Sequence, residues 1–443
     1  MKNQNNIDFN AYMPTANTPK KRLWRVLACV IGAIVFFAAG AATLWFTLDS
    51  ELRTLIKVKK MINEEYYKDI SDEEFYGVLF KSINEDLLDP YSCYMTADEY
   101  TASFGELAGN RSGLGLVFRV KDGEGRDIMK ITRVSGNSPA EQAGIIAGSY
   151  LVGFGKTQES LIESESFDDF SAFLGDFGAG EEFFLKLRVE EETEIIKISK
   201  AEYVENYVFY RTHDKAYGFE GKKATELVER GTPLTCLNED TAYIRLVQFG
   251  GEAASSFGQV MKLFKQEDKK HIVLDLRGNG GGYLDIMQEI AGYFCKNTDE
   301  NKPVVAVADY GEKKESFLAK RNLYKEYFQA DSRIFVLADE GSASASECLL
   351  GSMLDYGAIT YADICLAERN GVAKTYGKGI MQSTFYLGLK GDAIKLTTAE
   401  IRWPVTNNSI HGRGILPSDG TKTVQEGITD EEEIDAAIAL FNI

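Results

Sequence analysis

Residues 334–354 read IFVLADEGSASASECLLGSML: an apolar run, a turn of small residues and a second apolar run. The first run predicts a buried strand and the second a helix, an order typical of α/β domains. The turn places Ser344 near the start of the helix, where unpaired N–H groups and the positive end of the helix dipole favour an oxyanion. Ser344 is therefore a candidate nucleophile, although a serine at this place is also a common helix N-cap.

The same order of elements occurs earlier in the chain. Residues 271–277 read HIVLDLR and predict a buried strand, which runs into the glycine-rich loop 278–282 and then a helix. Glycines let the backbone approach a substrate and direct N–H groups at a developing negative charge. A phosphate-binding loop is the alternative interpretation. It is disfavoured because the lysine of that motif is missing and Tyr283 stands where the third glycine of a dinucleotide loop would be.

A serine hydroxyl needs a base, and the chain offers only three histidines besides its lysines. Residues 375–382 read TYGKGIMQ, with Lys378 between two glycines. Lys378 can act as a base only when neutral, and burial in an apolar pocket lowers a lysine pKa by up to roughly 3 to 5 units. If the stretch is a strand, Gln382 lies on the same side as Lys378 and can hold its amine. The alternative is a solvated strand lysine.

Residues 111–200 have a different sequence pattern, with short β-rich runs around a helix that starts at Pro139 and ends at Gly144. The region opens with SGLGL at residues 112–116, a loop that can direct N–H groups at a peptide carboxylate while its leucines line an apolar pocket. The candidate peptide-binding residues are Gly113, Leu114, Gly115 and Leu116. An ordinary glycine-rich turn is the alternative for the loop alone. With the turn at residues 148–151 the whole pattern resembles a bacterial PDZ domain, departing from it at Ser149.

The segment Val26–Leu48 contains no charged residue and is long enough to span a membrane as a helix. It follows a basic stretch, which predicts a cytoplasmic N-terminus and an extracytoplasmic remainder. We expect an uncleaved anchor; a signal peptide cleaved near residues 39–41 is the alternative. Two amphipathic helices follow, with apolar residues spaced over 52–66 and 75–87. These helices can belong to a hydrophobic core, act as a spacer or form a dimer contact.

Composition excludes some classes of function. The net charge is −18, which disfavours nucleic acid as a partner. Hydrophobic content of 44% and charged content of 26% are typical of folded domains. The six cysteines include no C-x-x-C pair and do not indicate a disulfide framework, a zinc site or redox chemistry. We expect no metal and no organic cofactor.

In this order the motifs resemble those of the carboxyl-terminal processing proteases, also called tail-specific proteases. The resemblance covers about residues 52–420 and also includes DPYS at 89–92, YMT at 94–96 and LTTA at 396–399. It implies a multidomain α+β and α/β fold: a cytoplasmic tail (1–25), a transmembrane anchor (26–48), a helical region (49–110), a PDZ-like domain (111–200) and a serine protease domain with a crotonase/Clp-like α/β core (201–443).

The resemblance also implies roles for individual residues. It makes Ser344 the nucleophile, Lys378 the general base and Gln382 the residue that orients the lysine. The oxyanion hole would combine the amide of Ala345 with that of Gly281 or Gly282. The implied partners are proteins or peptides with accessible C-termini, with a homodimer as a further possibility. Two features depart from the family pattern. The gap between Ser344 and Lys378 is longer, and we expect the excess around residues 361–374 to loop outward, with residues 368–371 as the loop insertion. Gly280 stands in place of a frequent proline.

Two other functions are compatible with parts of the sequence. The order Ser344, then Asp363 or Asp392, then His411 is that of an α/β-hydrolase triad, but Ser344 lacks the flanking glycines of that motif. A membrane-tethered PDZ scaffold with an inactive protease domain is the second. It is disfavoured because Ser344, Lys378 and Gln382 are all present.

Overall fold

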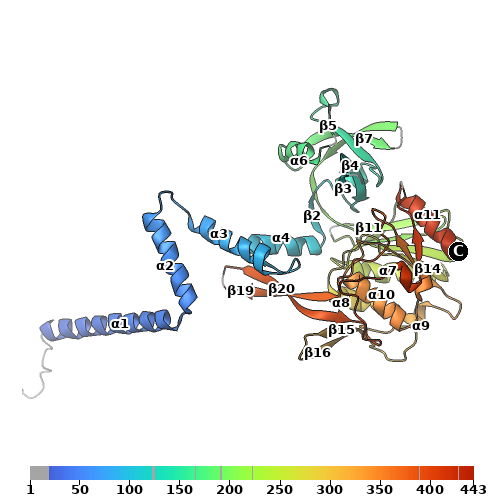
Figure 1. The fold of residues 1–443 in the computed structure, drawn as a ribbon. Coiled ribbons are helices and arrows are strands. Elements are labelled where there is room, and N and C mark those ends of the chain that lie inside the picture. The colour runs from blue at the N-terminus through green and yellow to red at the C-terminus, as the bar shows by residue number, and fades with distance from the viewer. Residues whose placement is uncertain are drawn as a thin grey trace, which may run out of the picture. The chain divides into compact units, whose positions relative to one another are not determined.

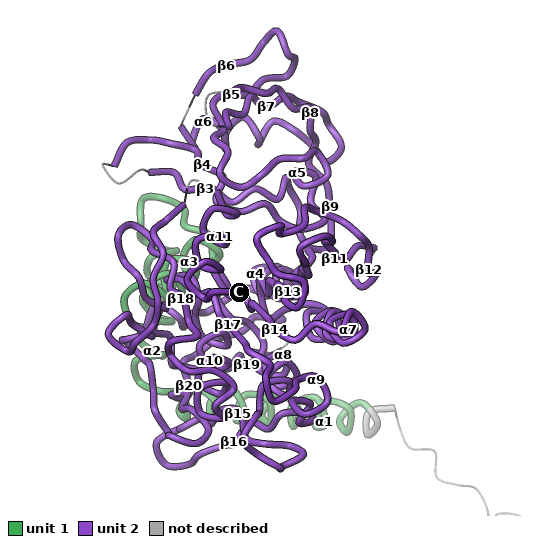
Figure 2. Tube along the Cα trace, turned by 90° about the vertical axis from the view of Figure 1, so that its right-hand side faces the viewer, with its two compact units in different colours: residues 1–87 green, residues 88–443 purple. Residues whose placement is uncertain are grey.

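The computed structural model describes residues 19–121, 125–164, 166–189, 192–221, 223–388, 390–427 and 429–443. The chain divides into two compact units, Met1–Leu87 and Leu88–Ile443, coloured green and purple in Figure 2. Most of the predicted cytoplasmic tail lies outside the described residues.

Unit 1 is helical: α1 (Pro19–Thr47), α2 (Ser50–Glu65), α3 (Asp72–Ser82) and a π-helical turn (Ile83–Leu87). Within α1, Leu23–Thr47 is long and apolar enough to cross a membrane. The two predicted amphipathic helices are confirmed. The Ser71 side chain accepts the amide hydrogen of Glu74 at 3.0 Å, as its capping pattern predicts.

Unit 2 contains a small antiparallel sheet built from the β-rich region. Its strand order is β3-β4-β5-β7-β8, with β6 paired to β5. The elements are β3 (Leu116–Lys121), β4 (Asp127–Val134), α5 (Pro139–Gln142), β5 (Tyr150–Gly155), a 3₁₀ turn (Gln158–Ser160), β6 (Ile162–Glu163), α6 (Phe167–Gly175), β7 (Glu182–Val189) and β8 (Glu192–Ser199). Figure 1 shows α6 beside this sheet. Phe170, Phe183 and Leu185 pack in its core, which is separate from the other hydrophobic clusters of the unit.

A two-stranded ribbon joins this small sheet to the rest of unit 2. It pairs β2 (Asn110–Gly113) with β9 (Ala201–Val204) and follows β1 (Cys93–Met95) and α4 (Ala97–Leu107). The chain therefore enters and leaves the small sheet side by side (Figure 1).

The largest sheet has eight strands in the order β12-β11-β10-β13-β14-β17-β18-β21. The strands from β13 to β21 pair in parallel and the others antiparallel. Their bounds are β10 (Val208–Arg211), β11 (Ala216–Glu220), β12 (Glu226–Glu229), β13 (Thr241–Leu246), β14 (His271–Asp275), β17 (Ile334–Ala338), β18 (Ile364–Ala367) and β21 (Lys422–Val424). The predicted α/β region is thus present as a mixed sheet.

Helices cover both faces of this sheet because its strands alternate in the direction of their side chains. On β14, Ile272 and Leu274 join one hydrophobic cluster while Val273 joins another. The first cluster holds α7 (Ala253–Gln266), α8 (Leu284–Ala291), α9 (Tyr324–Tyr327) and α10 (Ala345–Asp355). The second holds α11 (Asp430–Phe441).

A second sheet brings distant segments to the same place. It has the order β1-β20-β15-β16, with β19 paired to β20. The new elements are β15 (Val304–Asp309), β16 (Lys314–Leu318), β19 (Ile380–Leu387) and β20 (Asp392–Arg402). The pairing of β1 with β20 sets Cys93 opposite Lys395, just over three hundred residues later in the chain.

One expectation from the sequence is wrong. Residues 361–374 are not a single outward loop, because they contain a 3₁₀ turn (Tyr361–Asp363) and then β18, a fully buried strand of the large sheet. Only the turn at 369–372 remains as the extra segment, closed by a bridge between Arg369 and Val372. Even there the Arg369 side chain points inward, with an ion pair to Asp339 at 3.1 Å. The remaining short 3₁₀ turn is Pro417–Asp419.

Candidate active site

Two neighbouring parallel strands, β14 and β17, end at the same edge of the large sheet, with Leu274 opposite Val336. The loop after each strand leads to a helix, α8 or α10. The Asp339 carboxylate fixes the two loops to each other by accepting the amide hydrogens of Gly278 at 2.8 Å and Gly341 at 2.9 Å. The two turns that the sequence analysis singled out are therefore one structure.

The second turn carries three serines, and their hydroxyl groups differ in the hydrogen bonds that they make. The Ser342 hydroxyl donates to the carbonyl of Leu276 and the Ser346 hydroxyl donates to the carbonyl of Asn279, both at 2.8 Å. Within the described residues the Ser344 hydroxyl donates no hydrogen bond. Ser344 also lines a hollow of about 500 Å³, whereas Ser342 and Ser346 are completely buried. Of the three, Ser344 is the one available to react.

The backbone of Ser344 is in a conformation that residues with a side chain rarely adopt, with φ 56° and ψ −114°. Such a conformation costs on the order of 1–3 kcal/mol and persists only where the surroundings impose it. Here the start of α10 follows directly, and the amide of Ser344 donates to the Glu347 carboxylate at 3.2 Å. The strained turn aims the side chain outward, as in the nucleophile turns of other hydrolases.

The glycine loop lies directly against this serine. A Cβ atom at Gly281 would be 2.8 Å from the Ser344 Cβ and 2.9 Å from the Ala345 nitrogen. The Gly281 amide donates to the Asn279 side chain at 3.0 Å, so it is already used. Within the described residues the amides of Gly282 and Ala345 donate no hydrogen bond. These two remain free to bind a negative oxygen.

Glu347 joins the serine turn to the lysine segment, and the sequence analysis did not assign it a role. Its carboxylate is buried and accepts hydrogen bonds from the Thr375 hydroxyl at 2.6 Å and from the amides of Gly377 and Lys378, both at 2.8 Å. Burial raises the Glu347 pKa, and these hydrogen bonds oppose the rise. A glutamate three residues after a serine N-cap was the available signal, as in a capping box. Nothing local indicates its partners at residues 375–378.

Lys378 lies immediately before β19, not within it, and its side chain is partly buried. Burial lowers the pKa of Lys378, and the charge of Lys395 lowers it further, whereas Asp89 and Glu347 oppose the change. The Lys378 Nζ atom lies 4.7 Å from the centre of the Tyr91 ring. Within the described residues it makes no hydrogen bond to Ser344, although both side chains line the same hollow.

Gln382 also lines this hollow, but its amide group donates to the Thr397 hydroxyl at 3.4 Å. The register of β19 against β20 shifts between Met381 and Gln382, which interrupts the simple alternation that the sequence predicts. The role of Gln382 toward the lysine stays a prediction.

The structure brings together more residues than the sequence predicted. The rest of the hollow is largely apolar, with one further lysine and one arginine; its side chains include Met95, Phe104, Leu284, Cys348, Ile401, Arg133 and Lys395. No histidine lines it. His411, the base of the alternative triad, is exposed, and Asp392 accepts hydrogen bonds from Tyr94 and Ala97 instead. Among the described residues no cluster of side chains could hold a metal ion.

The candidate peptide-binding loop lies apart from this hollow, at the start of β3. Gly113 and Gly115 have φ values of 138° and 82°, and a Cβ at Gly115 would be 2.1 Å from the Ser138 Cβ. Among the described residues β3 pairs only with β4, so it is an edge strand of the small sheet. The amides of Leu114 and Gly115 donate no hydrogen bond within the described residues.

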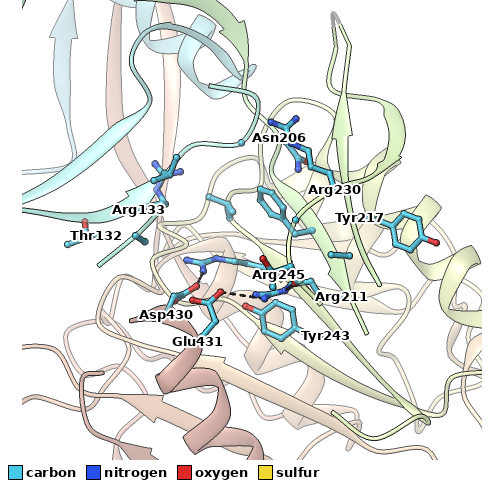
Figure 3. A pocket seen from close by; sticks show the side chains of 18 residues that line it. Thr132, Arg133, Asn206, Arg211, Tyr217, Arg230, Tyr243, Arg245, Asp430 and Glu431 are labelled. Atoms are coloured by element: carbon cyan, nitrogen blue, oxygen red, sulfur yellow. Dashed lines mark hydrogen bonds and ion pairs between the residues drawn. The ribbon is translucent and has the colours of Figure 1, made fainter. Parts of the chain in front are cut away.

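A smaller cavity of about 210 Å³ separates β4 from the large sheet and the start of α11 (Figure 3). Its arginines are paired: Arg211 with Glu431 at 3.4 Å, and Arg245 with Asp430. Arg230 reaches across to Glu141, within the short helix α5, and to Asn137, which precedes that helix. The cavity shares Arg133 and Val247 with the hollow that Ser344 lines. Its charged residues tie the small sheet to the rest of unit 2.

The fold and this site define a serine-type peptidase. Residues 240–419 match the model of peptidase family S41. The chain belongs to this family and is a C-terminal processing protease of the CtpA-like kind.

Similar proteins agree with this identification. A Staphylococcus aureus protein described as a CtpA-like serine protease is 28% identical over 410 residues, covering 89% of this chain and 72% of the relative. A Staphylococcus saprophyticus protein with the same description is 29% identical over 400 residues, covering 88% and 71%. The solved structure of a Bacteroides fragilis protein described as an S41 protease has a TM-score of 0.53 at 16% identity, covering 85% of this chain and 91% of that one. This last likeness concerns the fold.

Proposed function

We propose that Ser344 is the nucleophile and Lys378 the general base of this peptidase, and that the small sheet captures the carboxyl end of the substrate. The observation that carries the assignment is the difference among the three serines of one turn. Two hydroxyl groups are committed to backbone carbonyls, and the third opens into the hollow that Lys378 also lines.

The proposed reaction begins with neutral Lys378 accepting the proton of the Ser344 hydroxyl as its oxygen attacks the carbonyl carbon of the scissile bond. The lysine then gives this proton to the leaving amine, which leaves an acyl-enzyme. Lys378 next takes a proton from a water molecule as the water oxygen attacks the ester carbonyl carbon. The bond to the Ser344 oxygen then breaks, Lys378 returns the proton to that oxygen, and the second peptide leaves as a carboxylic acid. Hydrogen bonds between catalytic groups are often long before substrate binds, so the present separation of the two side chains is compatible with this sequence.

The developing oxyanion is proposed to bind the amides of Ala345 and Gly282. Both are unused as donors within the described residues, and Ala345 lies at the N-terminus of α10, where the helix dipole adds positive potential. Gly281 then has a different task. It allows the loop to pass within contact distance of Ser344 while its amide is held by Asn279.

The small sheet is proposed to act as a PDZ domain. A peptide in extended form would add as a further strand to β3, with its carboxylate bound by the amides of Leu114 and Gly115. The exposed Phe167 on α6, whose ring lies 5.9 Å from that of Phe118 on β3, supports an apolar partner. The core beyond it is proposed to be of the crotonase/Clp-like type.

A peptide pair tests capture of the carboxyl end. We expect an unstructured peptide with an apolar C-terminal residue to be cleaved with a KM at least about tenfold below that of the same peptide ending in an amide. The amide peptide lacks the carboxylate and therefore its charge-assisted hydrogen bonds to the loop. A short chromogenic peptide that does not reach the small sheet should be cleaved equally in both forms. Equal KM values for the long pair would reject this role of the loop.

The helix α1 is proposed to remain as a membrane anchor with the peptidase outside the cytoplasm. Leu23–Thr47 supports a membrane-spanning or exported segment by length and composition. N-terminal sequencing of the mature protein separates the two cases. An intact N-terminus in the membrane fraction agrees with an anchor, and a new N-terminus near residue 42 would show a cleaved signal peptide instead.

A homodimer through unit 1 is the remaining proposal about partners. Its support is the exposure of apolar side chains on α2, among them Leu52, Ile56 and Met61. Light scattering of a soluble fragment from residue 49 should give twice the monomer mass, and Met61→Glu should reduce it. A monomer mass for the unmodified fragment would reject the dimer.

A further inference from the structure

Among the described residues, the side-chain nitrogen of Lys378 has an aromatic ring as a close partner. Its Nζ atom lies 4.7 Å from the centre of the Tyr91 ring. A cation within about 6 Å of a ring centre is attracted to the negative face of the π system, whereas a neutral amine gains little there. The contact therefore discriminates between the two protonation states of the side chain.

Tyr91 is held in place independently of the lysine. Its amide donates to Asp89 at 2.8 Å, and Asp89 is itself bound by the hydroxyl groups of Ser92 at 2.6 Å and Thr397 at 3.2 Å. This turn is thereby attached to β20. The Tyr91 hydroxyl lies 3.4 Å from that of Tyr376, an interaction that raises the Tyr91 pKa and keeps the phenol neutral.

The ring and the serine line different hollows. Tyr91 lines a second hollow together with Gly280, Ala343 and Tyr376, whereas Ser344 lines the first. Lys378 lines both. A lysine whose Nζ atom lies against the ring makes no hydrogen bond to the Ser344 hydroxyl, so the observed arrangement is a resting one.

The charged groups that affect the pKa of Lys378 come from three elements. Glu340 and Lys374 also line the second hollow, and Arg133 lines the first. Lys395 on β20 repels the ammonium form, while Asp89 in the turn before β1 and Glu347 on α10 attract it. Tyr91 is a neutral neighbour. Because burial and Lys395 favour the neutral amine, the ring is the contact that selects the ammonium form without adding a charge to the site.

We infer that Tyr91 is a positioning residue for Lys378, holding the ammonium form of its side chain against the ring and away from Ser344, so that the ring sets the pH at which the lysine becomes a base. On deprotonation the amine gives its proton to water, loses the attraction to the ring and is free to turn to the serine hydroxyl. The inference rests on the proposed roles of Ser344 and Lys378.

A series of substitutions at one position tests it, with kcat/KM measured against pH on a short peptide. The rise of kcat/KM with pH reports the base in the free enzyme. Tyr91→Leu should move the midpoint of this rise by about 0.5 to 1 pH unit toward lower pH, the size expected from loss of one cation–π contact. Tyr91→Phe keeps the ring and should leave the midpoint in place. Tyr91→Trp provides a stronger π face and should move it toward higher pH.

The Phe variant is the matched control, since it removes only the hydroxyl group and its contact with Tyr376. An unmoved midpoint in the Leu variant, or equal shifts in the Leu and Phe variants, would overturn the inference. If the Leu variant does not fold, the Phe and Trp variants still decide, because an unmoved or lowered midpoint with tryptophan contradicts it.

The test also separates this inference from the proposed function. Ser344→Ala and Lys378→Met, measured in the same assay, should lose cleavage. If they do and the Tyr91 series shows no ordered shift, only the role of Tyr91 is wrong. If either of them retains the wild-type rate, the serine–lysine assignment itself fails.

Discussion

The two turns that form the site have the same strand-loop-helix topology. Both contain backbone with positive φ, but at different kinds of residue. After β14 the positive φ values fall on Gly278, Gly281 and Gly282, at 69°, 101° and 138°. After β17 a positive φ falls on Ser344. Glycine adopts such conformations without steric cost, whereas serine is strained.

The difference shows what each turn is for. The glycine turn supplies backbone amides and needs no side chain, so it is built from residues that let the chain pass close to Ser344. The serine turn must present a side chain, so it accepts strain and is held by Asp339, by its two buried hydroxyl groups and by Glu347. The backbone strain at Ser344 and the conformational freedom of the glycines beside it together form one site.

The largest effect should come from Ser344→Ala. Loss of a catalytic nucleophile typically lowers kcat by about 10⁴-fold or more. In Ser346→Ala the carbonyl of Asn279 still accepts the amide of Ala343, so activity should stay within about tenfold of wild type. Steady-state cleavage of a short peptide by the two variants compares them. Equal losses would contradict the assignment of one serine as nucleophile.

Next in size is the effect of a methyl group in the glycine turn. Gly281→Ala would place a Cβ 2.8 Å from that of Ser344 at positive φ, and should lower kcat by about 10²-fold through misplacement of the serine. It should also lower the free energy of unfolding by about 1–3 kcal/mol. At Gly280 no atom lies within 4 Å of an added Cβ, so Gly280→Ala should unfold at nearly the wild-type temperature. Thermal unfolding of both variants tests the contrast, which is lost if they are equally stable.

Glu347→Gln should have a smaller effect than either. A glutamine side chain has one oxygen acceptor instead of two, so it cannot accept all the hydrogen bonds that join the serine turn to the lysine segment. We expect kcat to fall by about tenfold and KM to change little, since the substrate does not touch this carboxylate. Glu347→Ala should lose more activity. A glutamine variant with wild-type kcat would show that the junction does not position the lysine.

The smallest effect concerns pH. Burial and then Lys395 lower the Lys378 pKa, so the neutral amine should begin to predominate at a pH lower than the ordinary lysine pKa of about 10.4. The rise of kcat/KM with pH should therefore have its midpoint below that value. Lys395→Met removes the repelling charge, so the pKa of Lys378 and the midpoint should move to higher pH. Lys395→Arg keeps the charge and serves as the control. A midpoint that moves to lower pH in the methionine variant would exclude this electrostatic account.

Sequence reasoning found the two turns because each combines a short apolar strand with small residues and an apolar helix. Ser344 and the glycine loop were predicted for that reason, and Lys378 was predicted from its two flanking glycines. Glu347, Tyr91 and Lys395 were not assigned roles, because their partners come from segments brought together only by the folded chain. The buried strand β18 was missed because four apolar residues next to a polar turn do not stand out from a loop.

Covalent labelling tests the pairing of Ser344 with Lys378 most directly. Treatment with a fluorophosphonate, followed by mass spectrometry of the peptide containing residues 341–347, locates the reactive hydroxyl and gives its rate of modification. The account predicts label on Ser344 alone in the wild-type protein and a rate lower by at least about 10²-fold in Lys378→Met, since the general base is missing. Label on Ser342 or Ser346, or a wild-type rate in the lysine variant, would contradict it.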